Sequence, residues 1–199
     1  MKLSPIITIQ ALLTTTTATV TLHTSFDARE ATIETVHNAL FSRLNTCRDI
    51  VSSFIARIEA YNPTINAVLT LNPHALDIAD ELDARLSIGN ATGALFCVPV
   101  LLKDNYDTKD MNTTGGSLAL AGSQPSEDAP SVRAMKDAGA IMLGKVNLHE
   151  LALEGISVSS LGGQTFNPYD QTRTPGGSSG GTGAAIAAGF AVFGTGMTC

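Results

Sequence analysis

The sequence predicts an α/β fold in which helices flank a largely parallel sheet. Two observations point to this class. In several segments apolar side chains recur every three or four residues, which is typical of amphipathic helices. Short, nearly uncharged runs of apolar residues lie between those segments, and strands that alternate with helices favour parallel pairing. The 199 residues fit one domain or part of a larger one.

Two helices are predicted first. Thr32 is suited to cap a helix that extends to Phe41, because its hydroxyl can accept a hydrogen bond from an N–H of the first turn. Thr46 and Asp49 have the spacing of a capping box and predict the start of a second helix. We expect this helix to stop at 62–63, an Asn-Pro pair, because proline has no N–H to donate.

A strand, a helix and a second strand are expected next. The apolar run 67–71 predicts a short strand, and the Asn-Pro pair at 72–73 predicts the start of a helix with apolar positions within 75–86. Residues 98–102 are all apolar, and this run ends abruptly at Lys103. The sequence therefore predicts a buried strand with a lysine at its carboxyl end.

The same alternation continues toward the C-terminus. Residues 130–138 predict a helix, and 140–143 predict another buried strand. Asn147 has the capping-box spacing for a short helix that runs to residue 154. We expect His149 to lie on the solvent side of that helix.

Composition excludes several classes of function. The net charge is −6 and the 12 Lys and Arg residues are scattered, so no basic surface for nucleic acid is expected. Three cysteines are too few for a disulfide scaffold, and their odd number argues against a complete disulfide set. The four histidines show no metal-binding spacing, and we expect neither a metal nor a cofactor.

Residues 1–24 have the pattern of a secretory signal peptide. A lysine at position 2 is followed by an uncharged stretch, of which only 6–13 is strongly apolar, too short to span a membrane. We expect residues 25–199 to form the folded part of a secreted protein. The alternative is a cytoplasmic protein with an unstructured leader.

Two N-glycosylation triplets, at Asn90 and Asn112, are compatible with secretion, although such triplets also arise by chance. Asn112 is the less suitable of the two, because it adjoins a loop expected to be near the active site.

The strongest chemical signal is the loop 176–183, in which Ser178 and Ser179 are surrounded by glycines. A run of small residues after it predicts a helix, whose N-terminus carries free N–H groups and a partial positive charge. Three interpretations remain open: a phosphate cradle, a purely structural glycine loop, and hydroxyl chemistry. The phosphate cradle is disfavoured because the loop lacks the Gly-Lys-Ser/Thr sequence of a P-loop.

Lys103 is the second signal. A single lysine is usually a surface residue that extends its charged end into water. This one directly follows an uncharged strand, however, and sites form at the carboxyl ends of parallel strands. Burial disfavours the charged form of an amine, and a neutral lysine can accept a proton from a hydroxyl.

Taken together, these segments resemble the amidase signature family from about Ala31 onward. The matching stretches are 57–63, 98–105, 114–117, 139–147, 163–169 and 175–181. The resemblance implies a mixed sheet flanked by helices, of which this chain holds an incomplete part. It also implies hydrolysis of carboxamide C–N bonds.

The resemblance also assigns roles to the two signals. Lys103 matches the catalytic base. Ser178 matches a relay serine, which in the family follows a cis peptide bond, here from Gly177. Ser179 is implied to support this Ser–Ser–Lys network by hydrogen bonding. Ala152 and Cys199 fall where the family has substrate-lining residues.

The family's nucleophilic serine has no counterpart in this chain. It is expected about two dozen residues after the relay serine, and only 21 residues follow Ser178. We therefore expect an N-terminal fragment of an amidase domain that does not act alone on small amides. The alternatives are a non-catalytic remnant and a protein similar to the amidase subunit of tRNA-dependent amidotransferases. The sequence indicates no particular oligomeric state.

Overall fold

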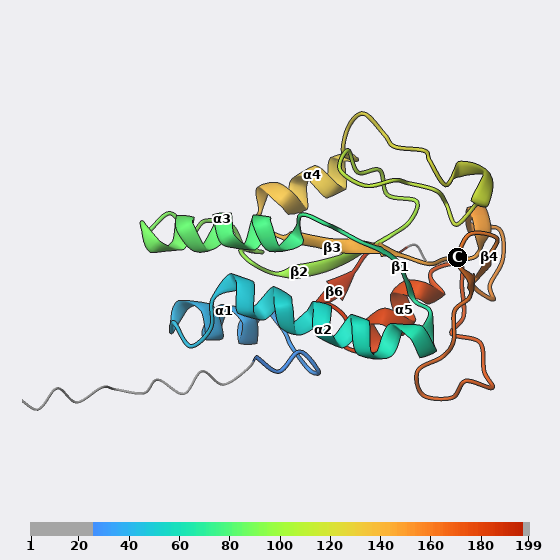
Figure 1. Ribbon diagram of the computed structural model, residues 1–199, viewed down its shortest axis with the longest axis horizontal. Coiled ribbons are helices and arrows are strands. Elements are labelled where there is room, and N and C mark those ends of the chain that lie inside the picture. Colours follow the sequence, from blue (N-terminus) through green and yellow to red (C-terminus); the bar gives the residue numbers. More distant parts are fainter. Residues whose placement is uncertain (1–25, 197–199) are drawn as a thin grey trace, which may run out of the picture.

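The computed structural model describes residues 26–196, which form a four-stranded mixed sheet flanked by helices (Figure 1). The stretch 1–24 interpreted as a signal peptide and the candidate residue Cys199 lie outside these residues. The strands are β1 (Val68–Leu71), β2 (Pro99–Lys103), β3 (Ile141–Val146) and β6 (Phe193–Gly194). Their order is β1-β3-β2-β6, with β2 parallel to β3 and β6 and with β1 antiparallel to β3. The predicted α/β class is confirmed, and the sheet is mixed because of its edge strand β1.

Five α-helices are described in this part of the chain. They are α1 (Ile33–Phe41), α2 (Cys47–Ile65), α3 (Ala75–Ser87), α4 (Pro130–Asp137) and α5 (Gly180–Ala187). Shorter elements are the 3₁₀ turns η1 (Leu118–Leu120) and η2 (Glu150–Ala152) and the ribbon of β4 (Val158–Ser159) with β5 (Gly163–Gln164). The capping boxes predicted at Thr32 and Thr46 are both present.

Different helices cover the two faces of the sheet. Leu101 and Ile141 belong to a large apolar core shared with α1, α2, α3 and α5. Val100 and Met142 belong to a second core, together with Val132 of α4. Figure 1 shows α4 on the other side of β2 and β3 from α1 and α2. Because β2 and β3 are buried throughout, both read as nearly continuous apolar runs.

The predicted end of α2 is wrong. The helix passes through Pro63 and continues to Ile65. Proline removes only one N–H near the end of a helix, where the remaining backbone bonds still form. The helix ends instead at Asn66, whose φ of 54° is left-handed. Asn62 then accepts the N–H groups of residues 67 and 68 and leads the chain into β1.

Two other boundaries differ from the prediction. The helix α3 begins at Ala75, because Asn72 first forms a turn in which its side chain accepts the N–H of His74. The predicted helix at 147–154 is wrong. The side chain of Asn147 bonds instead to Gly163 and Thr165, and only the short turn η2 forms.

A disulfide joins Cys47 to Cys97, with Cα atoms 5.7 Å apart. Cys47 is the first residue of α2, and Cys97 lies just before β2. Both are fully buried. The cross-link therefore connects the main helix of one face to the start of the strand that carries Lys103, a pairing that the sequence did not predict.

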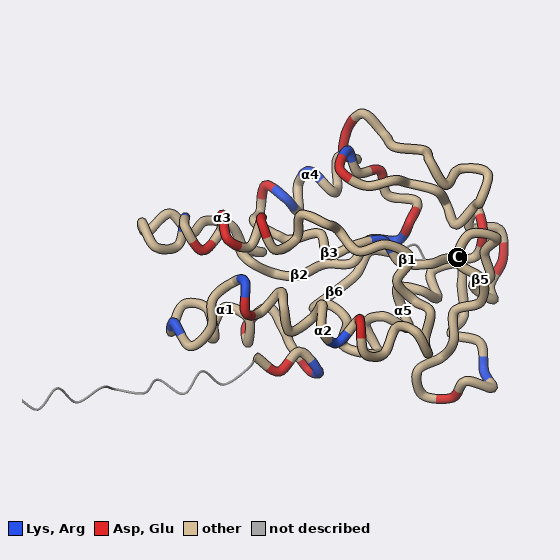
Figure 2. The backbone as a smooth tube through the Cα atoms, in the orientation of Figure 1, with Lys and Arg blue, Asp and Glu red and all other residues tan. Residues whose placement is uncertain are grey.

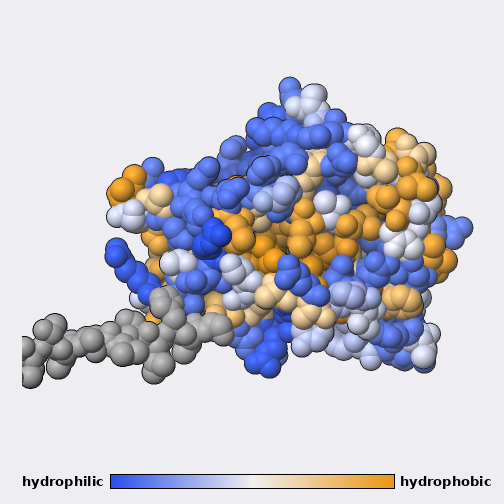
Figure 3. Space-filling model, in the orientation of Figure 1, coloured by the Kyte–Doolittle hydropathy of each residue, from blue (hydrophilic) through white to orange (hydrophobic). Residues whose placement is uncertain are grey.

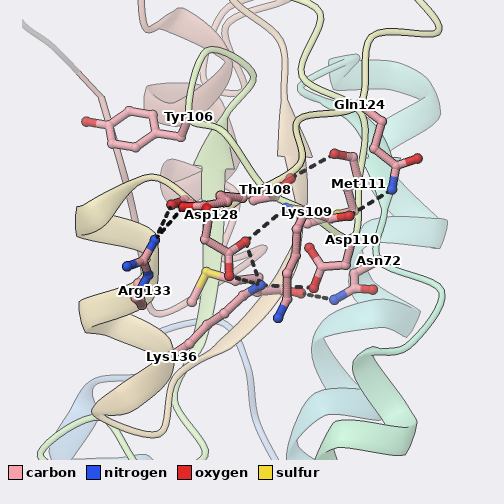
Figure 4. A network of polar contacts seen from close by, with 12 residues as sticks. Asn72, Tyr106, Thr108, Lys109, Asp110, Met111, Gln124, Asp128, Arg133 and Lys136 are labelled. Atoms are coloured by element: carbon pink, nitrogen blue, oxygen red, sulfur yellow. Dashed lines mark hydrogen bonds and ion pairs between the residues drawn. The ribbon is translucent and has the colours of Figure 1, made fainter.

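The loop that follows β2 is fastened to α4 by polar contacts (Figure 4). Lys136 of α4 donates to Asp110 at 3.0 Å and to both carboxylate oxygens of Asp128 at 3.0–3.1 Å. Burial alone would raise the pKa of Asp128, but the N–H of Lys109 and the ammonium group of Lys136 hold it below its ordinary value. Asp128 therefore stays ionised and keeps this loop on the sheet.

The surface has no single dominant character. Figure 2 shows charged residues of both signs mainly in helices and loops. In the same view, Figure 3 shows apolar side chains gathered in the band between α2 and α4, surrounded by polar residues. No helix within residues 26–196 is long and apolar enough to cross a membrane.

Candidate active site

The structure brings together Lys103, Ser178 and Ser179, three of the residues predicted for the site. Lys103 ends β2 and is fully buried. Its Nζ donates to the Oγ of Ser178 at 2.8 Å and to the Oγ of Ser179 at 2.9 Å. Ser178 is only 2% exposed. A nitrogen and two hydroxyls at these distances can pass protons among themselves.

The glycine loop is fixed by hydrogen bonds from its neighbours. The peptide bond between Gly177 and Ser178 is cis, as the family resemblance implies. The carbonyl oxygen of Ser178 accepts the N–H of His149 at 3.0 Å. Ser157 donates to the carbonyl of Gly176 at 2.7 Å and accepts the N–H of Gly180 at 2.9 Å. The hydroxyl of Ser178 is therefore held at a defined position beside Lys103.

The glycines of this loop are required for close packing. A Cβ on Gly181 would lie 1.9 Å from the carbonyl oxygen of Asn147, and one on Gly177 would lie 2.7 Å from the backbone of Gly155. Backbone atoms cannot move away as a flexible side chain can. The structural interpretation of these glycines is therefore supported, and the hydroxyl chemistry of the two serines stays a prediction.

Ala152 does not join the Lys103–Ser178 pair directly. It ends η2, is half-buried and has a left-handed φ of 61°. Its N–H donates to the carbonyl of His149 at 2.8 Å, and His149 in turn bonds to Ser178. Ala152 is thus connected to the glycine loop through one residue.

His149 was expected on a solvent-exposed helix face, and this prediction is wrong. Its side chain is 15% exposed. Its Nε2 lies 3.8 Å from a carboxylate oxygen of Glu154, and its buried Nδ1 has no hydrogen-bond partner within the described residues. The segment turns inward because Leu151 and Ala152 both have positive φ, which ends the helix after three residues.

Thr195 is a site neighbour that the sequence did not reveal. Its Oγ1 accepts the backbone N–H of Lys103 at 3.1 Å, and its carbonyl accepts the hydroxyl of Thr182 at 2.7 Å. It follows β6, which pairs with β2. A threonine after a two-residue strand has no pattern that a sequence reading could detect.

A second buried lysine, Lys145, lies beside the first. It pairs with Leu102 in the β2–β3 ladder and is 1% exposed. Its Nζ donates to the carbonyl oxygens of Tyr106 and Asn112 and to the hydroxyl of Thr113, at 2.8–3.0 Å. These partners belong to the loop after β2, on the face opposite α5.

Lys145 also forms a buried ion pair. Its Nζ lies 3.5 Å from Asp104, whose other carboxylate oxygen accepts the N–H and the hydroxyl of Thr114. Burial lowers the pKa of Lys145, and the negative charge of Asp104 opposes that shift. The signal that singled out Lys103, a lysine at the end of an apolar strand, was equally present for Lys145.

Within residues 26–196 no group of three or more His, Cys, Asp or Glu side chains is arranged to hold a metal ion. The contacts of Lys103 with Ser178 and Ser179 suit proton transfer between an amine and hydroxyls.

Comparison with known proteins places this arrangement in a family. The pattern of the amidase family matches residues 49–197. The chain belongs to the amidase signature family.

Individual relatives and solved structures agree with this assignment. The chain is 42% identical over 161 residues to the A subunit of the glutamyl-tRNA(Gln) amidotransferase of Picosynechococcus sp., covering 80% of this chain and 33% of that protein. It is 40% identical to the chloroplastic/mitochondrial counterpart of Zea mays, covering 79% of this chain and 30% of that one. The native peptide amidase of Stenotrophomonas maltophilia superposes with a TM-score of 0.77 at 39% identity, covering 81% of this chain and 35% of that structure. The chain spans about a third of the length of the curated relatives it matches.

Proposed function

We propose that this chain supplies the base and the proton relay of an amidase that hydrolyses small carboxamides. The observation that carries the proposal is the 2.8 Å hydrogen bond between the buried Nζ of Lys103 and the Oγ of Ser178. In a water-poor site burial disfavours the charged form of an amine, so Lys103 is suited to accept a proton. Ser178 is suited to pass one on, because a hydroxyl both donates and accepts.

The proposed reaction starts when a nucleophilic serine attacks the amide carbonyl. The hydroxyl proton of the nucleophilic serine moves to Ser178, while the hydroxyl proton of Ser178 moves to Lys103. The tetrahedral intermediate then expels the amine, which takes a proton back along the same path, and an acyl-enzyme remains. Water attacks the acyl-enzyme by the same relay and releases the carboxylic acid. Ser179, within 2.9 Å of Lys103, keeps the amine aligned with the relay.

The proposal requires a nucleophilic serine in addition to Lys103 and Ser178. The family resemblance implies this serine about two dozen residues after Ser178. We therefore expect the chain by itself to be inactive toward amides. A non-catalytic role is the alternative in which the Lys103–Ser178 pair has only a structural function.

A second candidate is a component of an amidotransferase, which the names of the relatives from Picosynechococcus sp. and Zea mays favour. The disulfide between Cys47 and Cys97 disfavours it, because disulfides persist in oxidising compartments and are rare where tRNA is aminoacylated. The same disulfide and the apolar N-terminal stretch support our proposal that the protein enters the secretory pathway.

The test begins with the transcript across the codon for Cys199. The continued chain, if the reading frame stays open, is assayed for ammonia release from a panel of carboxamides. We expect Lys103→Met and Ser178→Ala each to lower kcat/KM by about 10²–10⁴-fold, the usual contribution of acid–base groups. Lys109→Met and Ser160→Ala change exposed residues of the same types and serve as controls.

Two results would contradict the proposal. One is full activity of the Lys103→Met variant. The other is covalent labelling of the 199-residue chain by a fluorophosphonate probe that a single serine substitution abolishes, since this would place a nucleophile within the chain.

A further inference from the structure

The loop between α3 and β2 carries a feature that amide hydrolysis does not use, the triplet Asn90-Ala91-Thr92. Asn90 and Thr92 are both exposed. The neighbouring Ile88 is 77% exposed, and a Cβ added at Gly89 would meet no atom within 4 Å. Figure 1 shows that α3 ends at the side of the molecule remote from β4. A large group attached here would meet open solvent.

The side chain of Asn90 is available for reaction. Its backbone N–H donates to Arg85 at 2.8 Å, but its side-chain amide makes no hydrogen bond with any residue in 26–196. The hydroxyl of Thr92 accepts a hydrogen bond from Arg85 at 3.2 Å, which ties the exposed loop to the end of α3.

The second triplet, at Asn112, also has an exposed asparagine, but it makes more contacts and its hydroxyl residue is buried. Its Nδ2 donates to the carbonyl of Ala121 at 2.8 Å, and its own carbonyl accepts the Nζ of Lys145 at 3.0 Å. Thr114, the hydroxyl residue of this triplet, is 4% exposed and is bonded to Asp104. A sugar on Asn112 would attach at the Nδ2 that already bonds to Ala121, beside the buried Thr114.

The disulfide between Cys47 and Cys97 is an independent observation that points to the same compartment. Both cysteines are buried, so the bond is part of the folded core. Compartments that form disulfides are those in which secreted proteins also receive N-linked sugars.

We propose that Asn90 is an N-glycosylation site and that Asn112 is not. In this step Asn90 Nδ2 forms a bond to the anomeric carbon of an N-acetylglucosamine carried by a lipid pyrophosphate. The bond from that carbon to the pyrophosphate breaks, the pyrophosphate leaves with the electron pair, and the amide gives up one proton. The sugar extends into solvent from the exposed Asn90, and it leaves the Lys103–Ser178 pair unaffected. The proposal does not depend on amidase activity.

The test is expression of the chain with its own N-terminal residues in a eukaryotic secretory host, and in parallel with a heterologous signal peptide in place of residues 1–24. Peptide-N-glycosidase treatment followed by mass spectrometry locates each sugar by the conversion of asparagine to aspartate. We expect one sugar, lost in Asn90→Gln and in Thr92→Ala and kept in Asn112→Gln. Non-reducing peptide maps of the same samples report the Cys47–Cys97 bond.

Three outcomes would overturn the proposal. The first is a disulfide-bonded chain without sugar at Asn90. The second is a sugar at Asn112, with or without one at Asn90. The third is a chain that remains unmodified even with the heterologous signal peptide. None of these affects the amidase proposal, which is tested by the Lys103 and Ser178 variants.

Discussion

Lys103 and Lys145 stand at the ends of neighbouring parallel strands and are equally buried, yet their surroundings differ. Lys103 points toward α5 and contacts two serine hydroxyls. Lys145 points to the other face, where it contacts two carbonyls, a threonine hydroxyl and the carboxylate of Asp104. The negative charge of Asp104 favours the charged form of Lys145, and a charged amine has no lone pair with which to accept a proton. A buried lysine is therefore not a site by itself, and the groups around it decide whether it can exchange a proton or only hold a loop.

The largest expected difference between the two lysines is in stability. Lys145→Met should lower the free energy of unfolding by about 3–5 kcal/mol, because it leaves Asp104 buried without a counter-ion. Lys103→Met should lower it by only about 1 kcal/mol, since the hydroxyls that lose a donor can rotate toward other partners. Urea unfolding followed by circular dichroism measures both.

A double variant separates the ion pair from simple packing. Asp104→Asn combined with Lys145→Met should recover part of the loss, because no uncompensated charge is left. Equal losses for the two single lysine variants would show that the two environments do not differ in the way described.

The second prediction concerns the strands that carry the lysines. The strand β2 is anchored at its start by the Cys47–Cys97 disulfide, whereas β3 contains no cysteine. Replacing both cysteines by alanine should lower the free energy of unfolding by about 4 kcal/mol, the chain-entropy value for a loop of this length, given a sequence separation of 50 residues. Amide hydrogen exchange should increase more in β2 than in β3, and a uniform increase would argue against a local anchor.

The smallest effect is a dependence of stability on pH. Burial lowers the pKa of Lys145 in the folded state below its ordinary value of 10.5, which it regains on unfolding. Between the folded and unfolded pKa values the unfolded state binds more protons, so the stability of the fold rises with pH in this window and is lost as pH falls through it. In thermal unfolding from about pH 8 upward, the stability advantage of wild type over Lys145→Met should increase with pH. An advantage that stays constant, or that grows as pH falls, would contradict a lowered pKa of Lys145.

The sequence predicted most of the elements that position the site, because their signals are local. The capping boxes at Thr32 and Thr46 depend on residues three positions apart, and the strand that ends in Lys103 is a continuous apolar run. The prediction failed where a distant contact decided the outcome. Asn147 has a capping pattern, but its side chain bonds to Gly163 and Thr165 instead.

The contents of the site were predictable to a similar degree. Lys103 and Ser178 were found through motifs, and their proximity followed from the family resemblance rather than from spacing. Thr195 and the buried position of His149 depend on how β6 and η2 pack, which no local pattern records. The Cys47–Cys97 pairing likewise requires knowing that α2 starts beside β2.

The tight contact between Gly181 and the backbone of Asn147 has a consequence for how the protein can change. Residues 147 and 181 are packed against each other, yet the chain between them includes an exposed segment in which Tyr169 is 83% exposed. Insertions and substitutions near residue 169 leave the contact between residues 147 and 181 intact, whereas any side chain at position 181 forces the two backbones apart. Changes of length and sequence are therefore expected to be tolerated in the segment around residue 169, whereas Gly181 cannot be replaced without a shift of the backbone.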